Sequence, residues 1–129
     1  MNRTIIKTKD APSPVGTYNQ GIKVNGLIYT SGQIALNPKT NKLIDGGIDL
    51  QIDQIFKNLD AICKSAGSSI GSAVKLTVFL TDITYAPLVN KQIKKWFDSD
   101  SYPARSMVEV SKLPLNSNVG IECIAIEDE

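Results

Sequence analysis

The sequence of 129 residues predicts an α/β (α+β) fold, a two-layer sandwich in which two helices cover one face of a mixed β-sheet. The first observation is that apolar residues recur at three- and four-residue steps in two segments, as one face of a helix requires. The second is that apolar and polar residues alternate in shorter segments, as they do in strands. The expected order is β-β-α-β-α-β-β, in which helical crossovers make some neighbouring strands parallel.

The N-terminal part predicts a hairpin. A proline-rich segment, residues 11–16, is extended or turning, because no helix could cross it. Two short apolar runs follow at residues 22–24 and 27–31, separated by Asn25-Gly26. This dipeptide between apolar runs is the strongest short-range signal of a β-hairpin.

The first helix is expected at residues 50–66, and Gly67 suits the left-handed position that ends it. Residues 73–81 alternate as a strand. A second helix begins near Pro87, because the fixed φ of proline suits a first turn. The last two strands are expected at about residues 106–111 and 119–126. The two helices should bury their apolar faces, which comprise Ile52, Ile55, Phe56, Leu59, Ile62, Cys63 and Ala66 in the first and Leu88, Val89, Ile93, Trp96 and Phe97 in the second.

The composition excludes several classes of function. Fourteen basic and thirteen acidic residues give a net charge of +1, which provides no general attraction to nucleic acid or to anionic membranes. The lysines of the second helix (Lys91, Lys94 and Lys95) are interpreted as a solvated face in preference to a nucleic-acid surface. The chain contains no histidine, so it can form neither a Ser-His-Asp nor a Cys-His arrangement, nor a histidine-based zinc site.

The two cysteines, Cys63 and Cys123, are expected to be small core residues, so we predict neither a metal site nor a redox pair. No segment has the length of a signal peptide's apolar core or of a membrane span. We therefore expect residues 1–129 to form a single domain in the cytoplasm, without a membrane or nucleic-acid partner.

The last expected strand is apolar on both sides. Val119, Ile121, Cys123 and Ala125 share one side, and Gly120, Glu122, Ile124 and Ile126 share the other. Two helices cannot cover both faces of such a sheet. The second face needs a partner, and self-association is the simplest one, with pockets where subunits meet.

Three residues are candidates for chemistry. Arg105 follows the turn formed by Pro103, and a guanidinium fixed beside a strand can grip a carboxylate through two hydrogen bonds. A weak surface ion pair is the alternative. Glu122 would be partly desolvated beside Ile124 and suited to moving protons, unless it lies at a solvent edge or pairs with a lysine. Tyr18 offers a hydroxyl donor or, alternatively, an aromatic anchor for the N-terminal segment.

Two further positions suggest contacts with a ligand or a neighbouring chain. Ser31-Gly32-Gln33 interrupts a strand with a glycine, which often marks a bulge or a close approach to the backbone. Asn90 on the second helix could donate or accept a hydrogen bond across an interface, although an exposed asparagine is the more common case.

Taken together, these segments resemble the reactive intermediate deaminase family, the Rid or YjgF-type proteins, and within it the RidA subgroup. The resemblance extends from about Ala11 to Ala125. It depends on the order and spacing of Gly16-Thr17-Tyr18-Asn19-Gln20, Tyr29-Thr30-Ser31-Gly32-Gln33, Asn58-Leu59, Ala66-Gly67-Ser68-Ser69, Val74-Lys75-Leu76-Thr77-Val78-Phe79-Leu80, Val89-Asn90, Pro103-Ala104-Arg105-Ser106 and Ile121-Glu122.

The resemblance implies a chorismate-mutase-like fold and a homotrimer with ligand clefts between subunits. It also implies the hydrolysis of 2-imino acids, such as 2-iminobutanoate and 2-iminopropanoate, to 2-oxo acids and ammonia without a cofactor. Arg105 would bind the substrate carboxylate, Glu122 would orient the water and transfer a proton, and Tyr18 would close the pocket. The resemblance also assigns substrate contacts to Ser31, Gly32, Asn90 and the backbone around Met107.

Several positions depart from the family's common pattern, namely Thr17, Asn19, Met107 and Gly120. Methionine at position 107 removes a thiol or hydroxyl but keeps the backbone groups, so we expect a shifted substrate preference. Two other functions stay open. One is a trimeric module that senses small carboxylates in the same cleft, and the other is RNA cleavage, which the near-neutral charge disfavours.

Overall fold

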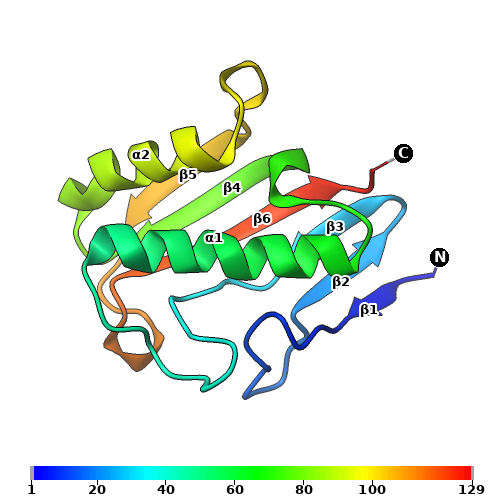
Figure 1. Cartoon of the computed structure of the whole chain (residues 1–129), viewed down its shortest axis with the longest axis horizontal. Helices are drawn as coiled ribbons and strands as arrows, with labels where there is room; N and C mark the ends of the chain where they lie inside the picture. The colour runs from blue at the N-terminus through cyan, green and yellow to red at the C-terminus, as the bar shows by residue number, and fades with distance from the viewer. Residues whose placement is uncertain (1, 129) are drawn as a thin grey trace.

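The computed structural model describes residues 2–128, which form one mixed β-sheet with two α-helices packed against one face (Figure 1). The two-layer α/β arrangement predicted from the sequence is confirmed. The strands are β1 (Thr4–Ile6), β2 (Gly21–Val24), β3 (Leu27–Thr30), β4 (Ala73–Leu80), β5 (Ala104–Glu109) and β6 (Val119–Ile126), and the helices are α1 (Ile48–Ser65) and α2 (Ala86–Trp96).

The strand order in the sheet is β1-β2-β3-β6-β4-β5. Strands β4 and β5 run parallel and are joined by α2, whereas the other neighbouring strands pair antiparallel. This topology leaves β5 at one edge of the sheet. Its outer side therefore carries backbone groups without a strand partner among residues 2–128.

One strand, β1, is missing from the sequence-based prediction. It pairs with β2 from Thr4 opposite Lys23 to Ile6 opposite Gly21. Three residues are too few to show an alternating pattern, and this strand is defined by its pairing and by the burial of Ile6. The prediction also started β5 at Ser106, whereas pairing with β4 begins at Ala104.

Backbone conformations confirm two expected chain reversals. Asn25 and Gly26, between β2 and β3, have φ values of 52° and 76°. Positive φ at both central residues is the mark of a type I′ hairpin turn, which matches the twist of the two strands. Gly67 has a φ of 83° immediately after the end of α1, as a glycine in the left-handed closing position should.

The core lies between the helices and the sheet. The apolar stripe predicted for α1 is buried, and Phe56 at its centre contacts the rings of Trp96 and Phe97 at centroid distances of 6.2 Å and 6.0 Å. Cys63 on α1 and Cys123 on β6 are both buried, as expected for core residues. A hydrogen bond shared with the Cys123 sulfur, together with burial, raises the pKa of the Cys63 thiol above its ordinary value.

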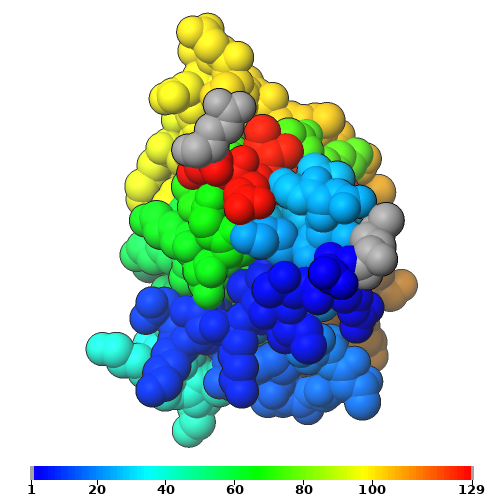
Figure 2. All heavy atoms as spheres, turned by 90° about the vertical axis from the view of Figure 1, so that its right-hand side faces the viewer, coloured from blue at the N-terminus to red at the C-terminus, as the bar shows by residue number. Residues whose placement is uncertain are grey.

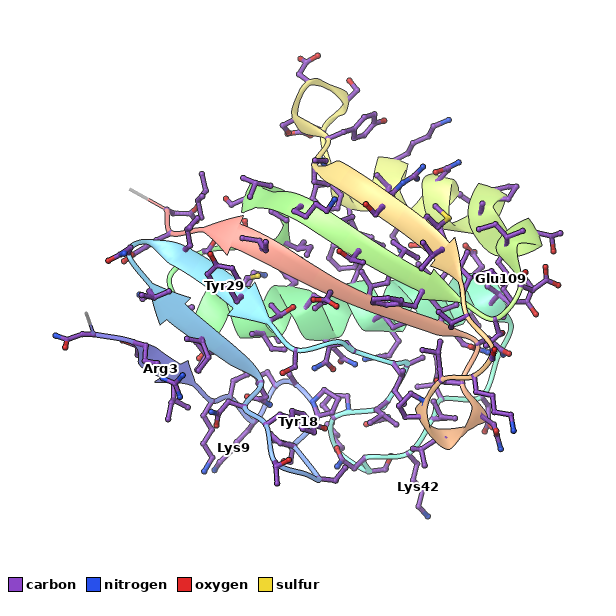
Figure 3. The ribbon with its side chains drawn as sticks, turned by 180° about the vertical axis from the view of Figure 1, so that it is seen from behind. Arg3, Lys9, Tyr18, Tyr29, Lys42 and Glu109 are labelled. Carbon is purple, nitrogen blue, oxygen red and sulfur yellow. The ribbon has the colours of Figure 1, made fainter. Side chains whose placement is uncertain are left out.

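The opposite face of the sheet has no helix over it (Figure 3). Apolar side chains are exposed there, including Tyr29 on β3, Val108 on β5 and Ile126 on β6. We call this surface the open face. Among residues 2–128, no helix is both long and apolar enough to cross a membrane. The same residues contain no cluster of three or more His, Cys, Asp or Glu side chains that could hold a metal ion.

Candidate functional site

Arg105 lies on the helix side of the edge strand β5. It pairs in register with Leu76 of β4, which is fully buried under the helices, so the two side chains share that face. Its Nη1 donates a hydrogen bond to Oδ1 of Asn90 on α2. Within the described part of the chain, no carboxylate forms an ion pair with Arg105. A guanidinium has five N–H donors, so most of them stay available to an anionic ligand.

A pocket opens where Arg105 and Asn90 meet, with a volume of about 470 Å³. Its other lining residues are Ile93 and Lys94 of α2, and Tyr102 and Pro103 of the connection to β5. This connection contains a short 3₁₀ turn and protrudes from the rest of the molecule (Figures 1 and 2). The pocket therefore combines two cations with apolar walls, a composition that suits a small organic anion.

The backbone of Met107 faces the free edge of the sheet next to this pocket. The N–H of Val110, which follows β5, donates to the carbonyl of Leu80 at 2.7 Å, so Val110 points its backbone groups toward β4. Backbone groups alternate in direction along a strand, and those of Met107, three residues earlier, point away from β4. The Met107 side chain is partly buried and packs against the core, so the backbone is the part of this residue that faces the free edge.

Tyr18, Ser31 and Gly32 form a second group, which lies where the chain leaves β3. The Ser31 Oγ donates to the carbonyl of Asn19 at 2.5 Å, and the Ser31 N–H donates to the carbonyl of Gln20 at 2.9 Å. Tyr18 and Gly32 line a largely apolar pocket of about 230 Å³. Tyr18 is 48% exposed. Figure 3 shows it among the loops below the sheet.

The sheet contains a bulge beside this group, as the glycine in Ser31-Gly32-Gln33 indicates. Tyr29 pairs with Ile124, but Gln33 pairs with Ile121, so four steps along one strand face three along the other. A Cβ added at Gly32 would meet no atom within 4 Å. The glycine is therefore not required by packing within this chain, and the space beside it is open to another group.

Glu122 lies on the open face, half-buried and opposite Thr77 of β4. Its neighbours Ile121 and Cys123 point to the helices and are buried. Arg105 therefore lies on the other side of the sheet and two strands away, a lateral separation of roughly 10 Å from strand spacing alone. Within one chain the structure brings Arg105 together with Asn90, but it does not bring Arg105 together with Glu122.

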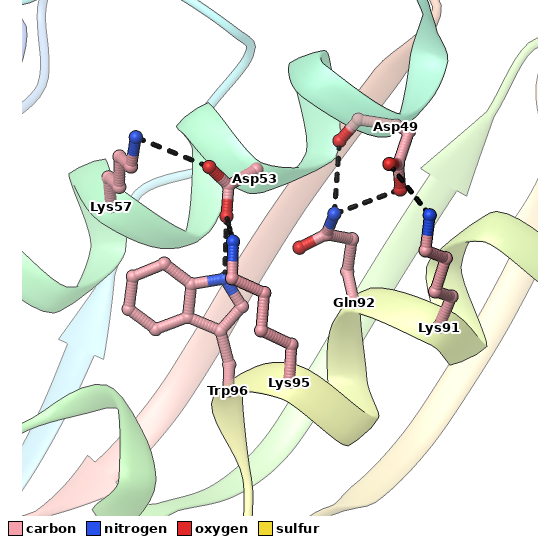
Figure 4. Close-up of polar contacts among 7 residues, drawn as sticks. All are labelled: Asp49, Asp53, Lys57, Lys91, Gln92, Lys95 and Trp96. Carbon is pink, nitrogen blue, oxygen red and sulfur yellow. Dashed lines mark hydrogen bonds and ion pairs between the residues drawn. The ribbon is translucent and has the colours of Figure 1, made fainter.

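A network of polar contacts holds α2 against α1 (Figure 4). Lys91 and Gln92 bind Asp49 at 3.1 Å and 2.9 Å, and Asp53 accepts from Lys95 at 2.8 Å and from the Trp96 indole at 3.1 Å. We call this set the α1–α2 seam; Lys57, a further residue of α1, also contacts Asp53. Because α2 carries Asn90, the seam also fixes the position of the partner of Arg105.

The seam shifts the titration of its acids. Burial by itself would raise the pKa of Asp53, but hydrogen bonds from Lys95, Lys57 and Trp96 outweigh it and hold the pKa below its ordinary value. Hydrogen bonds from Gln92 and Lys91 likewise lower the pKa of Asp49.

Four pocket residues were not predicted as site residues: Lys94, Tyr102, Pro103 and Ile93, of which Ile93 was expected only on the buried face of the second helix. Lys94 was grouped with Lys91 and Lys95, although only those two contact the acids of α1. One signal could have separated it, since Lys94 is four residues after Asn90 and so lies on the same face of the helix.

The comparisons with known proteins identify the family of the chain. A family model described as Endoribonuclease L-PSP matches residues 8–127. A protein of Dermatophagoides farinae named 2-iminobutanoate/2-iminopropanoate deaminase is 37% identical over 124 residues, which are 96% of each chain.

Solved structures show the same fold. The Rid-family protein YyfA from Yersinia pestis superimposes with a TM-score of 0.93 at 43% identity, over 97% of this chain and 99% of its own. The structure of TdcF from E. coli with bound serine has a TM-score of 0.89 at 34% identity, over 97% and 99% of the two chains. The chain therefore belongs to the Endoribonuclease L-PSP family, which includes the Rid proteins that its motifs resemble.

Proposed function

We propose that this protein hydrolyses 2-imino acids, such as 2-iminobutanoate and 2-iminopropanoate, to 2-oxo acids and ammonia. The observation that carries the proposal is Arg105, a guanidinium fixed by Asn90 at an open pocket without a carboxylate partner in the described chain. Such a group suits the carboxylate of an imino acid. The 37% identity to a protein named as this deaminase supports the proposed activity. A TdcF structure with bound serine supports a small carboxylic acid as the ligand.

We place the complete site between two copies of the chain. One copy contributes Arg105, Asn90 and the backbone of Met107, and its neighbour contributes Glu122 and the group of Tyr18, Ser31 and Gly32. The arrangement follows from Arg105 and Glu122 lying on different faces of the sheet and from the exposed apolar residues of the open face. The family resemblance implies three copies in the assembly, and a cytoplasmic location stays a prediction.

The chemistry needs only these side chains. Arg105 binds the carboxylate and fixes the imine carbon in the pocket. Glu122 accepts a proton from a water molecule as its oxygen attacks that carbon, and then returns the proton to the nitrogen. The carbon–nitrogen bond breaks, ammonia leaves, and loss of the remaining hydroxyl proton gives the 2-oxo acid. Tyr18 donates a hydrogen bond that closes the pocket. A protonated imine is already electrophilic, so the residues need to supply position and a proton acceptor.

A trapping assay tests the proposal. A threonine dehydratase generates 2-iminobutanoate in the presence of semicarbazide, which traps the imine that escapes hydrolysis. We expect the wild type to suppress trapping, Arg105→Ala to lose about 10²-fold or more in kcat/KM because it removes a bidentate charged contact, and Glu122→Gln to lose mainly kcat. Lys112→Ala, an exposed change of the same charge outside both pockets, serves as the control. Unchanged trapping by the wild type over several imines would contradict the deaminase.

The same variants separate catalysis from ligand sensing. If the protein only binds small carboxylates, the wild type binds 2-oxobutanoate but consumes no imine, and Arg105→Ala abolishes the binding. If it is an enzyme, Glu122→Gln keeps that binding and loses turnover. The family description names an endoribonuclease, but the net charge of +1 and the absence of histidine give RNA cleavage less support.

A further inference from the structure

We propose that Lys94 selects substrates with a second carboxylate, so that the site favours 2-imino and 2-oxo dicarboxylic acids over monocarboxylic acids of similar length. This inference rests on the proposed function, because it concerns the ligand that Arg105 holds. It goes beyond that proposal by naming a second cation, Lys94, and the second carboxylate of the substrate that this cation binds.

The three lysines of α2 have different surroundings. Lys91 pairs with Asp49 at 3.1 Å and Lys95 with Asp53 at 2.8 Å, so both charges belong to the α1–α2 seam. Lys94 lies on another side of the helix. It forms no ion pair or hydrogen bond with any residue in the described part of the chain, and it lines the pocket of Arg105. Its charge is therefore not offset by the acids that hold the helix in place.

The spacing along α2 places this charge within reach of one small ligand. Asn90 and Lys94 are four residues apart, so they lie on one face of the helix about one turn, roughly 5.4 Å, from each other. Asn90 is the residue that contacts Arg105. A ligand whose first carboxylate binds Arg105 can thus direct a second carboxylate, two or three carbons away, toward the Lys94 ammonium.

The rest of the pocket fits such a ligand. Its other lining residues, Ile93, Tyr102 and Pro103, provide apolar contacts for a short carbon chain, and no acidic residue of the described part of the chain lines it. Its volume of about 470 Å³ lies within the usual range of small-molecule sites, so a four-carbon monocarboxylic acid leaves space beyond its methyl group. A dicarboxylic acid fills that space and neutralises the second cation.

The expected preference is modest, since Lys94 is exposed and water screens its charge. Exposed charge pairs contribute at most about a fivefold change in an equilibrium constant. Titration calorimetry at low ionic strength with the stable 2-oxo products measures it directly. We expect 2-oxobutanedioate and 2-oxopentanedioate to bind the wild type about fivefold more tightly than 2-oxobutanoate, and added salt to reduce this ratio.

Matched variants locate the effect. Lys94→Gln should bring the affinities for the mono- and dicarboxylic acids to the same value, because it removes the second cation and keeps the contact of the first carboxylate with Arg105. Lys95→Gln removes the same charge from the same helix on the side of the seam, and we expect it to keep the preference. Arg105→Ala should weaken the binding of all three acids.

The possible failures are distinguishable. The role of Lys94 would be overturned if the wild type binds the mono- and dicarboxylic acids with equal affinity, or if its preference persists in Lys94→Gln. The deaminase proposal would then still be tested by the trapping assay. If the preference is lost equally in Lys95→Gln, the effect comes from general charge and the assignment to Lys94 is wrong. If the wild type binds none of the three acids, the proposed roles of both Lys94 and Arg105 in binding carboxylates are wrong.

Discussion

Asn90 determines where the positive charge of Arg105 lies. The asparagine accepts a hydrogen bond from the guanidinium without neutralising it, which an acidic residue at that position would do. The choice of an amide therefore keeps Arg105 both fixed and charged. At this scale the candidate site consists of an oriented cation without a carboxylate partner in the described chain, and in the proposed function the ligand supplies that carboxylate.

This arrangement gives a prediction about substitutions of Asn90. Asn90→Ala frees the guanidinium, and we expect the Kd for 2-oxobutanoate and the KM for the imine to rise about tenfold, with kcat changed less. Asn90→Asp should weaken binding further, since its carboxylate pairs with Arg105 and competes with the ligand. Calorimetry and steady-state kinetics measure both. Equal effects of the two variants would contradict a role based on charge, and an unchanged melting temperature excludes a general loss of structure.

The α1–α2 seam adds polar contacts to the apolar packing between the two helices. Asp53 accepts hydrogen bonds from two residues of α2, and its side chain is only 12% exposed. Its folded-state pKa lies below its ordinary value, so it stabilises the fold above its unfolded-state pKa of about 4, and this stabilisation is lost as pH falls through the folded-state pKa.

We therefore expect Asp53→Asn to lower the free energy of unfolding at pH 7 by about 1–2 kcal/mol, because hydrogen bonds to a charged acceptor become weaker. The difference from the wild type should shrink as pH falls below about 4, where the wild-type carboxylate also becomes neutral. Urea unfolding across this pH range measures it, with Asp100→Asn as an exposed control. A difference that is constant with pH would show that the charge of Asp53 is not the cause.

The elements were largely predictable because their signals are local. β6 lies where the alternation from Val119 to Ile126 places it, and the turn at Asn25-Gly26 has the expected positive φ values. β1 was not predictable, since three residues carry no period and its position depends on pairing with β2. The acids of the seam were also missed. Asp49 and Asp53 are ordinary surface positions of α1 until α2 packs beside them.

For the whole molecule, the candidate residues could be predicted singly but not their mutual placement. Whether Arg105 and Glu122 share a face depends on how β5 and β6 each register with β4, and those contacts are distant in sequence. Tertiary pairing places Leu76 beside Arg105 and Thr77 beside Glu122, and adjacent residues of a strand point to opposite faces. No pattern within either strand contains this information.

The proposed site between copies predicts complementation. Arg105→Ala and Glu122→Gln are each expected to be nearly inactive alone. After subunits of the two variants are exchanged at equal concentration, about a quarter of the sites should combine an intact Arg105 with an intact Glu122 from the neighbour in a closed ring. Imine trapping should then show about a quarter of wild-type activity. No recovery after confirmed exchange would mean that both residues act within one chain or that only one of them acts.

The placement of Arg105 and Glu122 on opposite faces has a consequence for how specific activity depends on the concentration of the protein. If a lone chain holds only half of each site, specific activity follows the law of mass action and is not a constant of the polypeptide. Dilution below the dissociation constant of the assembly would remove activity while each chain stays folded, and higher expression would restore it. The cell could then tune the removal of imines through the abundance of this protein more steeply than in proportion to it.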